Sequence, residues 1–169
     1  MAGELAIIER VIAEHQIIRR NLQGVQSYAT DYGAFFSLQQ AQSGLAQSAV
    51  EKLSEHKTRM LESLNQIQKG LNHHFSFEES ALPPLFGEAF MKALIFEHSE
   101  ITQYIAKAIV AGNLTFEGLS QQDILDHKAL VQKETARLVD MIEQHANLEE
   151  QMLRMLKKTF TGKISSADI

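Results

Sequence analysis

The chain has 169 residues, a formal net charge of -5 and 44% hydrophobic residues, which is enough to bury a sizeable core in one domain. It contains no cysteine, which excludes disulfides, zinc ribbons, thiolate-held iron–sulfur clusters and thiol nucleophiles. Any metal must therefore be bound by imidazole and carboxylate groups. The acidic balance argues against nucleic acid as a partner, because nucleic-acid-binding surfaces usually carry a basic stripe.

The first residues show no basic segment followed by an uninterrupted apolar run, so they do not resemble a secretory signal. The apolar stretches of the chain are too short to span a bilayer. We therefore expect a soluble, cytoplasmic protein with no membrane partner.

Apolar residues spaced three and four apart predict helices along the whole chain. The first predicted helix spans about Gly3–Ala29 and ends at a break over Thr30–Gly33. The second begins within Leu45–Ala49 and runs to about Leu82. It ends there because Pro83-Pro84 cannot continue the helical hydrogen-bond ladder and restricts the residue before it.

The third predicted helix spans about Gly87–Ala111. Thr115–Leu119 is predicted to be a short loop, and Ser120 is a plausible N-cap for the fourth helix, which extends to about Phe160. Four long amphipathic helices with mostly short connections predict an all-α fold, an antiparallel up-down four-helix bundle.

The bundle is expected to occupy residues 1–160, followed by a polar tail over 161–169. Phe35 and Phe36 are expected to cap the pole of the bundle away from the site described below. The alternative use for these two rings is a contact between copies of the chain, so a homo-oligomer is left open. Three methionines are interpreted as core filler: Met60, Met91 and Met152.

Six polar residues interrupt the apolar stripes of the predicted helices. One histidine falls on each inward stripe, and on two helices the next inward residue is a glutamate. These residues are His15, His74, Glu78, His98, His145 and Glu149. Around the Pro83-Pro84 turn, His74 lies ten residues before and His98 about fourteen after, so their depths differ by about one helical turn at ~1.5 Å per residue. We expect all six residues in one layer.

Burying such groups unpaired costs several kcal/mol each, unless they are paired or bind a metal. A single inward histidine would be interpreted as a satisfied core residue, but four beside two glutamates favour a metal site. Four imidazoles and two carboxylates suit iron, manganese or zinc. Six ligands are too many for one tetrahedral zinc. The set fits a dinuclear centre in which each metal takes two histidines and Glu78 and Glu149 bridge.

Both histidine–glutamate pairs belong to the same longer pattern, H-x-x-x-E-E-x-x-L. The first glutamate of each pattern shares the helical face of its histidine. Glu79 and Glu150 point about 100° away and are expected in solvent, so Glu149 is preferred over Glu150 as a ligand. The remaining histidines are not expected to be ligands and should lie at the surface, at caps or off the inward stripe: His56, His73 and His127.

The sequence resembles the hemerythrin-like family, the HHE cation-binding domain, over nearly its whole length. The matching segments are AEHQII around His15, HHFSFEESALPPLF around His74 and Glu78, FEHSEI around His98, and QHANLEEQML around His145 and Glu149. The resemblance implies an up-down four-helix bundle around an oxo- or hydroxo-bridged site with two iron ions. It also implies oxygen carriage, a response to oxygen or nitric oxide, iron handling, or repair of damaged iron centres.

Two features depart from the oxygen carriers of this family. Those carriers have a fifth histidine one turn before the equivalent of His98. Leu94 stands there, and the last carboxylate follows its histidine by four residues and not five. Both departures argue against reversible oxygen carriage. We therefore expect a non-haem di-iron protein that binds or responds to oxygen, nitric oxide or iron, with manganese or zinc as other occupants. The alternatives are an enzyme-like redox role on nitric oxide, peroxide or damaged iron centres, and a structural or regulatory bundle with a vestigial site.

Overall fold

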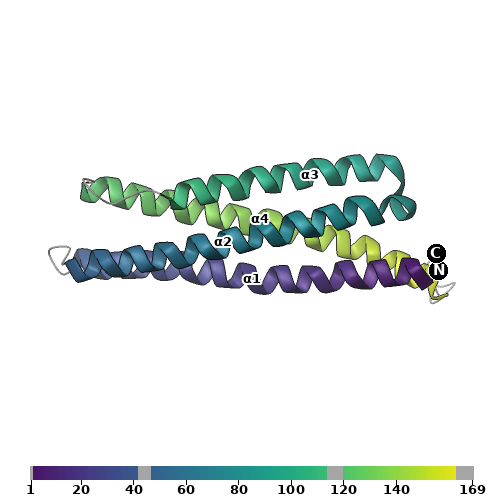
Figure 1. The fold of residues 1–169 in the computed structure, drawn as a ribbon, viewed down its shortest axis with the longest axis horizontal. Helices are drawn as coiled ribbons and strands as arrows, with labels where there is room; N and C mark the ends of the chain where they lie inside the picture. Colours follow the sequence, from purple (N-terminus) through teal and green to yellow (C-terminus); the bar gives the residue numbers. More distant parts are fainter. Residues whose placement is uncertain (1, 42–46, 114–119, 163–169) are drawn as a thin grey trace.

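The computed structural model describes residues 2–41, 47–113 and 120–162. These residues form four helices and no strand. The helices are α1 (Ala2–Ala41), α2 (Gln47–Ala81), α3 (Pro83–Gly112) and α4 (Gln121–Phe160). Each helix packs against its two neighbours, with α4 closing the bundle against α1. Successive helices run in opposite directions, and the start of α1 and the end of α4 lie at the same end of the molecule as the α2–α3 turn (Figure 1). The antiparallel bundle is confirmed.

The first helix is longer than predicted. A break over Thr30–Gly33 was expected, but α1 continues to Ala41. A single glycine in a helix costs about 1 kcal/mol relative to alanine, which weakens a helix without ending it. The Thr30 hydroxyl donates a 2.8 Å hydrogen bond to the carbonyl of Gln26 within the helix, so it does not compete for a turn. The side chains of Phe35 and Phe36, and with them the predicted cap, lie outside the described residues.

The turn between α2 and α3 is formed around the two prolines. The third helix starts at Pro83, four residues before the predicted start at Gly87. Proline suits the first position of a helix, where its missing N–H is not needed. Gly87 has φ 75° and interrupts the regular helix, so the regular part of α3 begins where the sequence pattern placed it. Leu82 packs into the core at this turn with 0% exposure.

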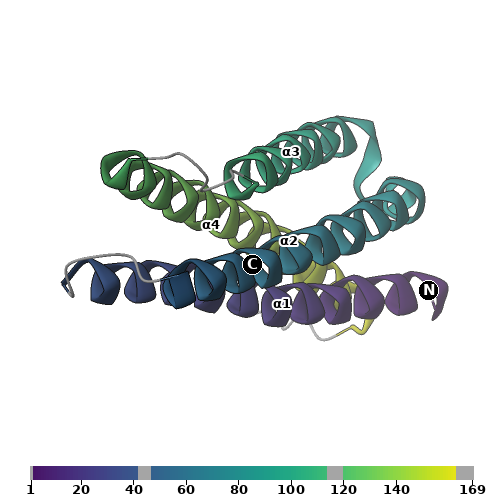
Figure 2. The same ribbon diagram turned by 60° about the vertical axis from the view of Figure 1, so that its left-hand side comes forward.

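The fourth helix begins as predicted. The Ser120 hydroxyl oxygen accepts a hydrogen bond from the Asp123 backbone N–H, and the Asp123 carboxylate accepts one from the Ser120 N–H at 3.0 Å. This reciprocal pair is a capping box. At its far end α4 lies against the start of α1 in the turned view of Figure 2, where Lys157 forms a 2.8 Å ion pair with Glu9.

The apolar core has two parts on either side of a polar layer. The larger part includes Leu22, Met60 and Leu138. The smaller part lies toward the α2–α3 turn and includes Ile8, Met91 and other residues. Met60 and Met91 are thus core residues as predicted, whereas Met152 is only partly buried. Within the described ranges, none of the helices is long and apolar enough to cross a membrane.

Candidate metal centre

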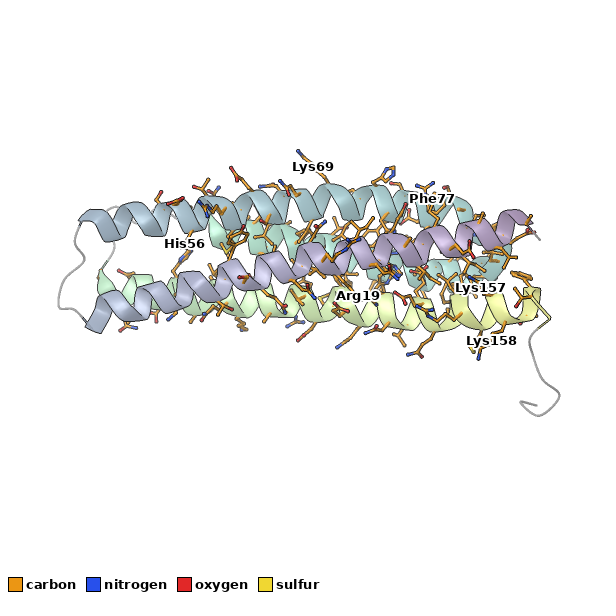
Figure 3. All side chains as sticks on the ribbon, turned by 90° about the horizontal axis from the view of Figure 1, so that it is seen from below. Arg19, His56, Lys69, Phe77, Lys157 and Lys158 are labelled. Atoms are coloured by element: carbon orange, nitrogen blue, oxygen red, sulfur yellow. The ribbon has the colours of Figure 1, made fainter. Side chains whose placement is uncertain are left out.

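The six inward polar residues meet in one buried layer of the bundle. Each helix supplies one histidine, and α2 and α4 each add the glutamate one turn further along. None of the six is more than 5% exposed: His15, His74, Glu78, His98, His145 and Glu149. Figure 3 shows that side chains fill the space between the helices. The sequence prediction of a single layer is confirmed.

Glu78 lies at the centre of this layer. Its Oε1 is 2.7 Å from Nε2 of His74 and 3.5 Å from Nε2 of His15. Its other oxygen, Oε2, is 3.2 Å from Nε2 of His98. The two oxygens of one carboxylate therefore face histidines of three different helices, which is the arrangement that a bridging carboxylate requires.

Glu149 is the second carboxylate of the layer and lies in one group of ligand atoms with Glu78. Its Oε2 is 3.3 Å from Nε2 of His15 and 3.7 Å from Nε2 of His145. Ligand atoms that lie within 4.8 Å of one another form two overlapping groups, and Glu78 belongs to both. The first group is His15, His74, Glu78 and Glu149, and the second is Glu78, His98 and His145.

The atoms that face the middle of the layer lack hydrogen-bond partners. All four histidine Nε2 atoms and all four carboxylate oxygens of Glu78 and Glu149 are buried without a hydrogen bond to any described residue. An unsatisfied buried polar group costs about 1–3 kcal/mol, and more if it is charged. Cations bound between these atoms would satisfy all of them at once. The residues present therefore fit a site for metal ions with nitrogen and oxygen ligands.

A second set of carboxylates surrounds the histidines from outside. The Nδ1 atom of each histidine faces a glutamate of an adjacent helix, and the pairs follow one direction around the bundle. A glutamate of α1 faces the histidine of α2, one of α2 faces that of α3, one of α3 faces that of α4, and one of α4 faces that of α1. The pairs are Glu14 with His74 at 2.8 Å, Glu79 with His98 at 2.9 Å, Glu97 with His145 at 3.2 Å, and Glu150 with His15 at 3.5 Å. We call these four glutamates the outer carboxylates.

The outer carboxylates have a defined chemical effect. A histidine that donates its Nδ1–H to a carboxylate keeps its Nε2 lone pair free to bind a metal, and its ring orientation is fixed. Three of the four pairs are hydrogen bonds. In the fourth pair, which is longer, the Glu150 carboxylate accepts hydrogen bonds from Arg19 of α1 and Arg154 of α4. Arg19 lies between α1 and α4 in Figure 3.

The sequence pattern had predicted both Glu79 and Glu150 to lie in solvent. For Glu150 this is wrong, because its residue exposure is only 8%. A rotation of about 100° from the inward stripe of a four-helix bundle points to the neighbouring helix as well as to water. The sequence did contain a signal that could have identified these glutamates. Every outer carboxylate directly precedes or follows one of the six inward residues in the sequence. Glu14 and Glu97 were missed for the same reason.

The remaining histidines do not join the layer. His73 is exposed, as its position off the inward stripe predicted. His56 lies eighteen residues before His74 on α2, or about 27 Å along the helix. His127 is buried rather than at the surface, and its Nε2 contacts the carbonyl oxygen of Ala111 near the end of α3. It thus fits the cap role that was one of its two predicted places.

Leu94 is an apolar residue of the core. It stands where the oxygen carriers of the hemerythrin-like family have a fifth histidine. It is 3% exposed and belongs to the smaller apolar cluster together with Met91 and Leu153. At this position one turn before His98, the chain offers no further nitrogen ligand. A pocket of about 140 Å³ between α3 and α4 reaches the edge of the layer at His145 and is also lined by Glu97, Glu100 and Leu148, among others.

In the metal-free layer the neighbouring carboxylates raise the pKa of His15 and of His98 against the effect of burial, so these two histidines hold protons that balance the buried carboxylates. Burial lowers the pKa of His15, but the carboxylates of Glu149 and Glu78 raise it by more, to about 9. Burial raises the pKa of Glu78, but His15, His74 and His98 overcome this and hold it well below its usual range. Burial and the charge of Glu78 raise the pKa of Glu149. Metal ions would take the place of these protons.

This balance gives a pH dependence for the metal-free protein. The pKa of His15 rises from 6.5 to about 9 on folding, so its protonation stabilises the fold fully below about pH 6.5 and this contribution is lost as pH rises through 9. His98 shifts in the same direction. We expect the urea midpoint of protein kept in chelator to fall between pH 6.5 and pH 9. A midpoint that is constant or rises over this window would contradict the assignment.

The outer carboxylates give a separate prediction. Glu97→Gln keeps the length of the side chain and removes the charge that faces Nδ1 of His145 at 3.2 Å. Loss of such an outer partner typically lowers metal affinity by about 10–100-fold. Competition with a chromophoric chelator should show this loss, while the exposed Glu100→Gln on the same helix serves as the matched control. Equal affinities for the two variants would remove the orienting role.

A four-helix bundle with a buried layer of imidazole and carboxylate groups defines a class of helical cation-binding proteins. The family model described as Hemerythrin HHE cation binding domain matches residues 6–156, so the chain belongs to this family. The match covers all six inward residues. It supports a metal-binding function for the layer. The comparisons with curated proteins and with solved structures gave no match.

Proposed function

We propose that the layer holds two iron ions and that the protein binds or responds to a small diatomic ligand, oxygen or nitric oxide. The observation that carries this proposal is the pair of overlapping ligand groups that share Glu78. The ligands would be His15, His74, Glu78, His98, His145 and Glu149. Manganese and zinc are the other ions that this donor set can accept.

Each chain residue would have a defined task in such a centre. His15 and His74 would hold one ion, and His98 and His145 the other. Glu78 would bridge the two, because its oxygens already face both groups. Glu149 lies within 3.7 Å of both His15 and His145, one histidine for each ion, and would be the second bridge. When bound, iron would supply a redox-active centre with positions open to an external ligand.

The surroundings support a small external ligand. Leu94 offers no additional nitrogen, so the layer supplies six ligand side chains for two ions. The pocket between α3 and α4 leads to the edge of His145 and is only about 140 Å³ in volume. Glu97 holds the outer nitrogen of His145 beside this pocket, and thereby keeps Nε2 directed inward.

Exposure of the reduced, iron-loaded protein to oxygen and to nitric oxide tests this function. We expect a new absorption band that appears on addition of the ligand and reports ligand bound at the metal. Continuous consumption of nitric oxide or peroxide would instead support the enzyme-like alternative. An unchanged spectrum with both ligands would contradict the proposal and favour a structural or regulatory bundle.

A further inference from the structure

A second pocket lies between the same two helices but beside a different part of the core. Its volume is about 500 Å³, within the range of about 300–1,000 Å³ that is typical of small-molecule sites. It is lined by Tyr104, Lys107, Val110, Leu130, Lys133 and Arg137, among others. None of these residues belongs to the metal layer or its outer carboxylates. A binding role for this pocket is therefore independent of the function proposed for the layer.

The charge of this pocket is opposite to that of the chain. The lining contains three cationic residues, Lys107, Lys133 and Arg137, and one acidic residue, Glu134. The whole chain, in contrast, carries a net charge of -5. None of these four forms an ion pair with another residue in the parts of the chain that the structure describes. Cations gathered in a concave surface attract anions from solution.

An aromatic ring brings two of these cations together. Nζ of Lys107 lies 4.5 Å from the centroid of the Tyr104 ring, and Cζ of Arg137 lies at the same distance of 4.5 Å. The two cations come from α3 and α4, so they converge from both walls of the pocket. A bound anionic group could contact both helices at once.

The remaining wall is apolar and open to water. Val110 is 74% exposed and Leu130 is 45% exposed, and both line the pocket. Pockets for small molecules are typically lined by apolar side chains with a few convergent polar groups. The pocket thus offers an apolar surface for the body of a ligand and cations for its head.

We propose that this pocket binds a small amphipathic anion, with a carboxylate or phosphate head on an apolar chain or ring. The head would lie between Lys107 and Arg137, with Lys133 close to them in the same lining. The apolar body would cover Val110 and Leu130. Glu134 lowers the charge of the lining to 3 − 1 = +2, which favours an anion of one or two charges.

Titration of the full chain with octanoate, octyl phosphate and the uncharged octanol tests this proposal. Calorimetry measures binding, and backbone amide shifts in the NMR spectrum locate it. We expect saturable binding of at least one anion, shifts that cluster in 104–111 and 130–137, and markedly weaker binding of octanol. Whichever anion binds more tightly identifies the head group. Binding of octanol as tight as that of both anions, or no saturable binding at all, would overturn the proposal.

Two variants separate this pocket from general surface binding. Arg137→Gln should weaken anion binding about fivefold, which corresponds to the upper value for one exposed charge pair. Lys69→Gln is the matched control, since Lys69 is exposed on α2 and away from the pocket (Figure 3). Equal effects of the two variants would overturn the proposal, as would a short acidic peptide that displaces the anion at equal or lower concentration.

Discussion

Addition of ferrous iron to the metal-free protein is expected to raise its thermal unfolding midpoint by about 10 °C. A ligand that binds only the folded state stabilises it by about 4 kcal/mol at a concentration of 1,000 Kd. For a domain of this size, 1 kcal/mol corresponds to about 2–4 °C. The gain would arise because bound ions would satisfy the four Nε2 atoms and four carboxylate oxygens that lack hydrogen bonds in the metal-free layer. Calorimetry under anaerobic conditions measures the shift.

The control for this shift is reversal by a chelator, which should return the midpoint to that of the metal-free protein. Magnesium supplies a second control, because it prefers an all-oxygen octahedral shell and should give little stabilisation at a site with four imidazoles. If iron leaves the midpoint unchanged at an excess that saturates known iron proteins, the layer does not bind iron in the folded state.

The second large effect is expected from Glu78. This carboxylate contacts Nε2 of His15, His74 and His98 and is shared by both ligand groups. Glu78→Gln should therefore reduce the affinity for both ions, by more than the about 10–100-fold that loss of an outer partner costs. Metal content after dialysis against a weak chelator measures the loss. A variant that still binds both ions as tightly as the original chain would exclude the bridging role.

The stability of the metal-free variants must be measured as well, so that loss of metal binding is distinguished from a folding defect. Glu78→Gln keeps the side-chain volume but removes one partner of the buried ion pairs with His15, His74 and His98, a change that typically costs about 3–5 kcal/mol. The exposed Glu62→Gln on the same helix is the matched control. We expect metal-free Glu78→Gln to unfold at a lower urea concentration than the original chain, and metal-free Glu62→Gln at the same concentration. Metal content is therefore compared without denaturant, where the circular dichroism of both variants must match that of the original chain, and only Glu78→Gln should lose metal.

Much of the bundle could be predicted from residue spacing, because packing of amphipathic helices follows their apolar stripes. The capped start of α4 at Ser120 and the turn at Pro83 depend on local chemistry that the sequence displays directly. The extension of α1 through Gly33 could not be predicted in this way. The small free-energy cost of one glycine is outweighed by the stability of the helix on both sides of it. That stability depends on packing in the bundle and cannot be judged from the residues around Gly33 alone.

The inward residues of the site could also be predicted, because a polar residue on an apolar stripe can be recognised in the sequence alone. The choice of Glu149 over Glu150 as the inward residue agrees with the observed placement, in which only Glu149 faces Nε2 of His15. The outer carboxylates could not be predicted in this way, because they do not lie on the apolar stripes. Whether Glu97 points to solvent or to His145 depends on the rotation of α3 against α4, which only the packed bundle determines.

The outer carboxylates also connect the fold to the site. Each of them ties the histidine of one helix to the helix beside it, so the four helices are linked in a closed circuit around the layer. A shift of one helix along its neighbour would break such a contact and turn a histidine away from the centre. The same contacts that orient the ligands therefore also favour one register of the helices.

The number of metal ions per chain tests the central claim most directly. Protein produced with sufficient iron and purified without oxygen should be measured by elemental analysis against a quantitative amino-acid determination. The two overlapping ligand groups that share Glu78 predict two iron ions per chain. A value below one metal ion per chain would contradict the dinuclear centre.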